Sequence, residues 1–139
     1  MIELRPLCMM TVQLKEPLDA GNTPAGHRII AEIASASLSG RLSGSLAGNS
    51  SADWLTMTPG GLGLPDVRLA IRTSDGALIL MRYGGRIRFR PGQPSTVMIA
   101  PVFETGDPRY SWLNEIQAAG KGTLSPDLTI LDYEISELE

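Results

Sequence analysis

The sequence has very little of the chemistry on which metal centres and nucleophilic catalysis depend. Among its 139 residues there is one cysteine, Cys8, and one histidine, His27. A single cysteine excludes an internal disulfide, and one residue of each type falls short of the usual zinc ligand sets. The same scarcity speaks against Ser-His-Asp and Cys-His catalytic systems. We therefore expect neither a bound metal nor a nucleophilic mechanism of this kind.

Signatures for cofactors, nucleic acids and membranes are also missing. The chain has no Gly-x-Ser-x-Gly elbow, no P-loop and no dinucleotide fingerprint, so no cofactor is predicted. Aromatic residues make up 5% and the formal net charge is −3, which argues against a nucleic-acid partner. No segment approaches the roughly 18 apolar residues of a membrane-spanning helix. The N-terminal MIELRPLCMM has Glu3 too early for a secretory signal. The resulting expectation is a cytoplasmic protein without a membrane partner.

What the sequence does contain is a series of short apolar or alternating segments separated by glycine and proline. The 15 glycines and 10 prolines punctuate the whole chain, and segments such as VRLAIRT, ALILMRY and STVMIAPVF have the length and alternation of β-strands. PRYSWLNEIQ is the one helix candidate, near residues 108–117, with Pro108 in its first turn and Gly120 beyond its end. Several strands in succession without a βαβ rhythm predict a single all-β domain over residues 1–139, folded as an antiparallel up-and-down barrel.

The clearest hairpin is VRLAIRTSDGALILMRY. Its Asp75–Gly76 pair suits a type I′ turn, in which both central residues have positive φ. Side chains alternate between the two faces of a strand, so Val67 and Leu69 share one face while Asp66 and Arg68 share the other. The sequence leaves open which of these faces points into the barrel.

The glycine-rich stretch SLSGRLSGSLAG, residues 37–48, alternates as a strand does. Gly40, Gly44 and Gly48 fall on one face together with the leucines between them, whereas a linker would not alternate in this way. We therefore expect a strand here. Its glycines either bend the barrel wall or leave volume inside it for a ligand, and the pattern supports both interpretations.

Residues able to carry chemistry are few, and most are carboxylates, arginines or aromatics. A carboxylate beside apolar walls has a raised pKa, which suits general acid/base catalysis. Asp53-Trp54 follows the glycine-rich stretch and is either a pocket mouth or a turn next to a core tryptophan. Arg68 lies two residues from Asp66, where it either forms a surface ion pair or orients an anionic substrate. Trp112 is either a ligand contact or a plug at one end of the barrel.

These considerations give two sets of candidate site residues. The candidate catalytic residues are Asp53, Asp66, Arg68 and Glu104, and the candidate ligand-binding residues are Arg28, Arg41, Trp54, Tyr83, Tyr110 and Trp112.

Four longer segments resemble a known family in the same order. They are AGNTPAGHRII, SADWL, DVRLAIRTSDGALILMRYGG and PVFETGDPRYSWLNEIQAAGKG, and they are similar to the domain of unknown function 3237 family of bacteria and fungi. The resemblance implies a lipocalin-like barrel of about eight strands, a size that holds one small ligand. It also implies small-molecule binding, with some members tied to secondary metabolism. The family usually has a glycine pair before its Asp-Trp, whereas Ser50 and Ser51 stand near that position here, so this loop is expected to differ.

The sequence supports more than one functional hypothesis. The first is a small-molecule-binding barrel that performs cofactor-independent acid/base catalysis on an apolar or aromatic metabolite, as an isomerase, a cyclase or a hydratase/lyase does. The alternative is a non-catalytic carrier or sequestering protein with the same pocket. A third is a structural module whose barrel is filled by its own side chains. The apolar LCMM at residues 7–10 is a candidate contact in a homodimer.

Overall fold

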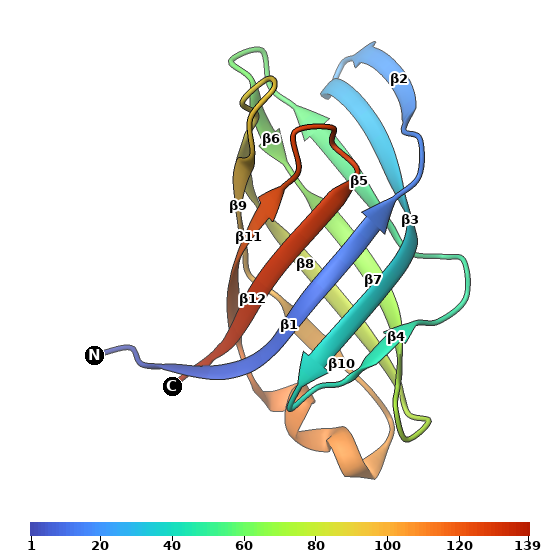
Figure 1. Cartoon of the computed structure of the whole chain (residues 1–139), viewed down its shortest axis with the longest axis vertical. Helices are drawn as coiled ribbons and strands as arrows, with labels where there is room; N and C mark the ends of the chain where they lie inside the picture. Colours follow the sequence, from blue (N-terminus) through green and yellow to red (C-terminus); the bar gives the residue numbers. More distant parts are fainter.

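In the computed structural model, which describes residues 1–139, most segments between the glycines and prolines are strands (Figure 1). The strands are β1 (Leu4–Leu14), β2 (Leu18–Thr23), β3 (Gly26–Gly40), β4 (Gly44–Leu46), β5 (Ala52–Met57), β6 (Leu62–Leu64), β7 (Asp66–Thr73), β8 (Leu78–Arg88), β9 (Ser95–Ile99), β10 (Val102–Glu104), β11 (Ala118–Leu124) and β12 (Ile130–Leu138). The one helix, η1 (Pro108–Glu115), lies between β10 and β11. The all-β class with one short helix is therefore confirmed.

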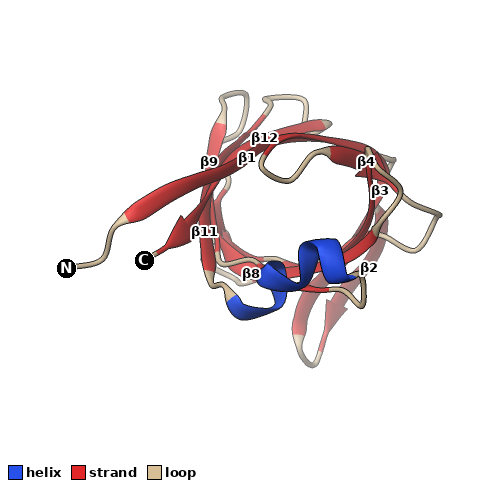
Figure 2. Ribbon diagram, turned by 90° about the horizontal axis from the view of Figure 1, so that it is seen from below, coloured by secondary structure: helices blue, strands red, loops and turns tan.

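The strands pair antiparallel and close into a barrel (Figure 2). Around the ring the order is β1-β12-β11-β9-β8-β6-β5-β7-β4-β3, and the pairing of β1 with β3 completes it. Ten of the twelve strands form this ring, because β2 pairs with β3 alone and β10 with β8 alone. The expectation of about eight strands is wrong. The strands β4 and β6 have three residues each, and their glycine-containing sequences are more typical of turns than of strands.

The alternation of β7 and β8 separates interior from solvent. Val67 on β7 is buried opposite Tyr83 on β8, whereas Asp66 and Arg68 point to solvent. The apolar face is therefore the inner face, which decides the question that the sequence left open. Burying one large apolar side chain contributes about 2 kcal/mol, so a slip of one residue along the strand would be costly.

The end of the barrel next to η1, called the lower end below, is filled and covered (Figure 1). Leu113 of η1 and Leu42, where the chain turns from β3 into β4, are both fully buried. Asp107 caps η1, because its carboxylate accepts a hydrogen bond from the Arg109 main-chain N–H at 2.9 Å. η1 is a 3₁₀ helix with a kink at Tyr110. No helix of the structure combines the length and the apolar character needed to cross a membrane.

The glycine-rich stretch is a hairpin and not a single strand. β3 ends at Gly40, the chain turns at residues 41–43, and β4 runs back along β3. Gly40 has a φ of +133°, and a Cβ at this position would lie 2.6 Å from the Leu7 carbonyl oxygen. A Cβ at Gly44 would collide with the Arg72 carbonyl oxygen. These glycines permit the turn and the close strand contact, so the structure favours the bend over the ligand volume.

The apolar segment at residues 7–10 lies in β1 and is used mainly within the barrel. Leu7, Cys8 and Met10 are buried in the core, while Met9 points to solvent. Burial raises the pKa of the Cys8 thiol to about 12, which makes this thiol unreactive near neutral pH. The homodimer stays a prediction.

Candidate functional site

The upper end of the barrel, opposite η1, opens into a cavity of about 640 Å³. Its wall consists of inner-face side chains from β1, β3, β5, β8, β9, β11 and β12. Its rim includes the loops around residues 15–17 and 127–129, at the top in Figure 1. Twelve of the 19 lining residues are hydrophobic, among them Ile87, Phe89 and Leu131. A cavity of this size and lining accommodates a small apolar molecule.

Most polar residues of the cavity lie at its rim, and two lie in its wall. Lys15, Glu16 and Asp127 belong to the exposed loops. Asp53 on β5 and Tyr133 on β12 come from strands and face the interior. The wall therefore offers one carboxylate and one phenol to a bound molecule in otherwise apolar surroundings.

The Asp53 carboxylate is held by its neighbour on β7. One of its oxygens, Oδ1, accepts a hydrogen bond from the Asp66 main-chain N–H at 2.9 Å, and Oδ2 accepts none from the protein. Burial raises the pKa of Asp53 to about 6, against the opposing effect of that hydrogen bond and with a small further rise from the Asp66 charge. Asp53 forms no ion pair. Near neutral pH it can both take and return a proton.

Two tyrosines lie next to this carboxylate. Tyr83 and Tyr133 are buried, and their rings meet edge to face with centroids 5.9 Å apart. Burial is the main cause that raises the pKa of both phenols, and the nearby Asp53 charge raises both further. Both phenols stay protonated at neutral pH. Tyr133 lines the cavity, whereas Tyr83 does not.

Gly122 makes room for the Tyr133 ring. The two residues are register partners on β11 and β12, and a Cβ at position 122 would collide with the ring. A larger residue here would force the ring out of its place. Tyr133 is not among the sequence-predicted site residues, although two signals point to it: its alternation with Leu131 and Ile135, which predicts a strand, and the glycine-rich segment before it.

The structure brings only some of the sequence-predicted residues together. Asp53 lines the cavity, and Tyr83 lies immediately behind it. Trp54 points the other way, with 53% of its surface exposed, because neighbouring residues of a strand face opposite sides. Asp66 and Arg68 also lie on the outer face.

The remaining candidates lie away from the cavity. Arg28 alternates with the inward-facing Ile29 and so lies on the outer face of β3, where its Nε is buried without a partner. Glu104 is exposed on β10. Tyr110 donates a hydrogen bond to Asp75 in the β7–β8 turn at 2.8 Å.

Arg41 and Trp112 meet at the lower end. The Arg41 guanidinium lies 5.3 Å from the centroid of the Trp112 ring and pairs with Glu137 at 2.8 Å. Trp112 is partly buried and packs against the core, in keeping with a plug at this end. No cluster of histidine, cysteine and carboxylate side chains in the structure could hold a metal ion.

Comparison with known proteins places the chain in a family. The family described as "Protein of unknown function (DUF3237)" matches residues 2–138. The chain belongs to this family. The resemblance drawn from the four sequence segments is thereby confirmed. A UPF0311 protein of Bradyrhizobium diazoefficiens is 28% identical over 137 residues, which cover 88% of this chain and 89% of its own length. A UPF0311 protein of Rhodopseudomonas palustris is 27% identical, with 94% of each chain covered.

Solved structures share the barrel. A β-barrel-like protein from Acinetobacter baumannii has a TM-score of 0.88 and 29% sequence identity, covering 100% of this chain and 97% of its own. A structure described as an enzyme from Penicillium herquei has a TM-score of 0.73 and 21% identity, covering 100% and 94%. At that identity the second likeness concerns the fold alone.

Proposed function

We propose that this protein binds a small apolar or aromatic metabolite in its upper cavity and transfers a proton on it without a cofactor. An isomerase, a cyclase or a hydratase/lyase works in this way. The observation that carries the proposal is the Asp53 carboxylate, which lies in the wall of an apolar cavity and has one oxygen free of protein partners. The raised pKa of Asp53, about 6, supports the same role, because an effective acid/base group titrates near the working pH.

In this proposal Asp53 acts first as a base. Its free oxygen, Oδ2, takes a proton from an acidic C–H or O–H of the bound molecule, and the electron pair left behind moves toward a neighbouring carbonyl or forms a ring bond. The Tyr133 hydroxyl donates a hydrogen bond to the oxygen on which negative charge develops. In an isomerisation or a cyclisation, Asp53 then returns the proton to another atom of the same molecule, so no atoms are gained or lost. In an elimination, Asp53 gives the proton to the departing hydroxyl group, which leaves as water, and a hydration runs through the same steps in reverse.

The apolar wall contributes by keeping water away from the reacting atoms. Charge–dipole interactions are stronger where water is excluded, and the neutral phenol of Tyr133 is then a better stabiliser of negative charge. A catalytic acid/base group of this kind contributes about 10²–10⁴-fold in rate. The Penicillium herquei structure is described as an enzyme, but its 21% identity carries only the fold, and the proposal rests on the cavity.

The experiment has two stages. Native mass spectrometry and thermal-shift measurements with a set of apolar aromatic ketones and phenols first identify compounds that bind. Exchange of carbon-bound hydrogen for deuterium from D₂O, followed by NMR, then reports proton transfer on those compounds. Asp53→Asn keeps the shape of the side chain but removes the base, and Asp132→Asn, on the outer face of β12, is the matched control.

We expect wild type and Asp132→Asn to catalyse exchange, and Asp53→Asn to bind but to lose about 10²–10⁴-fold in rate. Binding without exchange by wild type would identify a carrier. No binding by any compound would overturn the proposal for an enzyme and for a carrier alike.

A further inference from the structure

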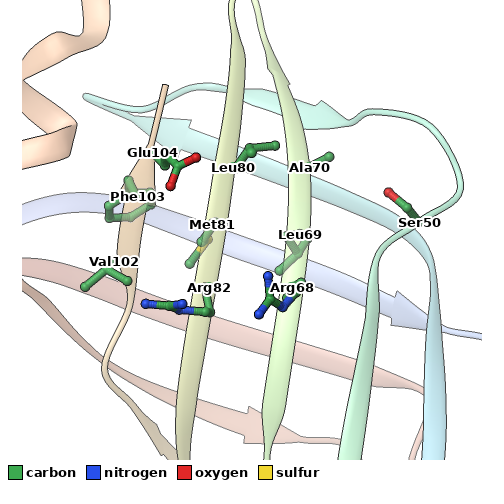
Figure 3. A pocket seen from close by; sticks show the side chains of 10 residues that line it. All are labelled: Ser50, Arg68, Leu69, Ala70, Leu80, Met81, Arg82, Val102, Phe103 and Glu104. Atoms are coloured by element: carbon green, nitrogen blue, oxygen red, sulfur yellow. The ribbon is translucent and has the colours of Figure 1, made fainter. Parts of the chain in front are cut away.

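A second hollow, of about 420 Å³, lies on the outer side of the barrel wall where β10 runs beside β8 (Figure 3). Arg68 on β7 and Arg82 on β8 lie side by side in it, with Glu104 of β10 at the next level of the sheet. We call this hollow the outer groove. It is separate from the upper cavity, which lies on the other side of the same strands.

Arg68 and Arg82 are direct register partners on the outer face. Side chains in such positions have their Cβ atoms about 5 Å apart, and like charges placed directly opposite each other destabilise a sheet. Neither guanidinium forms an ion pair or a hydrogen bond with the rest of the chain, whereas Arg41 and Arg109 each form both. Two arginines without an ion-pair partner lie side by side here, although the chain has more acidic than basic residues and a formal net charge of −3.

The carboxylates nearest in the sheet do not neutralise this pair. Asp66 lies one level away on β7, and Glu104 lies one level away on β10, where it is the register partner of Leu80. Neither reaches within ion-pair distance of either arginine. The chain itself therefore supplies no ion-pair partner for either guanidinium.

Apart from Ser50 and Glu104, the remaining residues of the outer groove are apolar. Val102 is the register partner of Arg82, and Leu80 lies one level away on the same outer face. Phe103, between Val102 and Glu104 on β10, is buried in the core beneath the groove. An apolar surface beside two guanidinium groups suits a molecule with one charged head and a short apolar body. The volume of about 420 Å³ is that of a small-molecule site.

We propose that the outer groove binds one oxyanion, a carboxylate or a phosphate, carried by a small molecule whose apolar part rests on Leu80 and Val102. Arginine is suited to this task because its planar fork donates two parallel hydrogen bonds to such a group, and each charge-assisted bond is stronger than a neutral one. The Arg68 side chain extends toward β8 and the Arg82 side chain toward β10 (Figure 3), so Arg82 turns toward β7 when both forks hold a single oxyanion, which removes the repulsion between the strands.

The direct test is an NMR titration of the ¹⁵N-labelled protein, followed through the arginine Nε–H signals. The probes are inorganic phosphate and hexanoate, at constant ionic strength. Arg68→Gln and Arg82→Gln remove one fork each. Arg86→Gln is the matched control, because Arg86 is also exposed on β8 but lies outside the outer groove and contacts only its neighbouring carbonyl, that of Gly85.

We expect saturable shifts of the Arg68 and Arg82 signals in wild type and in Arg86→Gln. Either groove substitution should weaken binding by at least about tenfold. Tighter binding of hexanoate than of phosphate would identify a carboxylate with an apolar tail as the ligand class, and the reverse order would identify a phosphate. Absence of saturation, or an equal loss of binding in Arg86→Gln, would overturn the proposal.

Thermal stability gives a second readout that does not depend on the choice of probe. Without added anion at low salt, Arg82→Gln should melt a few degrees above wild type, because the like-charge contact is gone. Added phosphate or hexanoate should raise the melting temperature of wild type and not that of Arg82→Gln. A lower melting temperature of Arg82→Gln without anion would show that the chain itself already balances the pair, which would overturn the proposal.

Discussion

The two ends of the barrel are built from the same alternating strands and yet have different interiors. At the lower end, large side chains such as Leu42, Ile71 and Leu113 are fully buried and η1 covers the opening. At the upper end the inner faces are also mostly apolar, with Asp53 and Tyr133 as exceptions, but no helix covers them and a cavity of about 640 Å³ remains. The difference therefore comes from what closes each end and not from the strand pattern. We therefore expect a small molecule to bind at the upper end, which no helix covers.

Truncating the lower-end core should have the largest effect on stability. Leu113→Ala removes a fully buried side chain, and we expect the free energy of unfolding to fall by about 2–5 kcal/mol. Leu131→Ala, in the cavity wall, removes a side chain that is only partly buried, and we expect a loss of about 1 kcal/mol. Urea denaturation of both variants measures the difference. Equal losses would show that the upper end is packed as closely as the lower end.

Moving Tyr133 should affect both the fold and the cavity. In Gly122→Ala the new Cβ collides with the Tyr133 ring, so we expect a loss of about 1–3 kcal/mol in stability together with weaker binding in the cavity. Urea denaturation and the thermal shift produced by a cavity ligand measure the two effects. Gly84→Ala is the control, since a Cβ there would lie 3.6 Å from the Pro65 carbonyl oxygen, an ordinary contact. Unchanged ligand binding by Gly122→Ala would remove Tyr133 from the site.

The raised pKa of Asp53 predicts a dependence of stability on pH. The folded protein holds this proton up to about pH 6, whereas the unfolded chain releases it near 3.8. The stability associated with the proton is therefore fully present below 3.8 and is lost as the pH rises through 6. Asp53→Asn cannot titrate, so it should become more stable than wild type by about 1–2 kcal/mol at pH 7.5, with a smaller difference near pH 4. Urea denaturation at both pH values tests this, and a constant difference would contradict it.

The sequence predicted the closed all-β barrel because alternation and turn signals are local. Asp75–Gly76 marks a turn by its own chemistry, but only Gly76 has a positive φ, +95°, so the turn is not the predicted type I′. Val67 and Leu69 show an apolar face without any knowledge of their partners. The sequence did not predict the three-residue strands β4 and β6, because they form only by pairing with other segments of the chain. The glycine-rich stretch was mistaken for one strand because its alternation continues across the tight turn at residues 41–43.

The candidate site was harder to predict because it depends on which face of each strand points inward. Asp53 and Trp54 are adjacent in sequence, and strand geometry places them on opposite sides of the wall. Tyr83 was named as a ligand-binding candidate while the direction of its face was left open, and the structure places it on the inner face, where it alternates with exposed residues of β8. Tyr133 was missed as a site residue because its neighbour across the barrel, Tyr83, lies 50 positions away along the chain.

The smallest change in stability is expected for a substitution on the outer face near the cavity. This substitution tests whether the ligand contacts only the inner side of the barrel wall. Trp54 is 53% exposed and faces away from the cavity, although Asp53 beside it lines the cavity. Trp54→Ala should change the free energy of unfolding by about 0.5 kcal/mol or less and leave the affinity of a cavity ligand unchanged. Urea denaturation and a thermal-shift titration with that ligand measure both quantities. Weaker binding in Trp54→Ala would mean that the ligand reaches over the rim to the outer surface, because side-chain alternation gives this tryptophan no route to the interior.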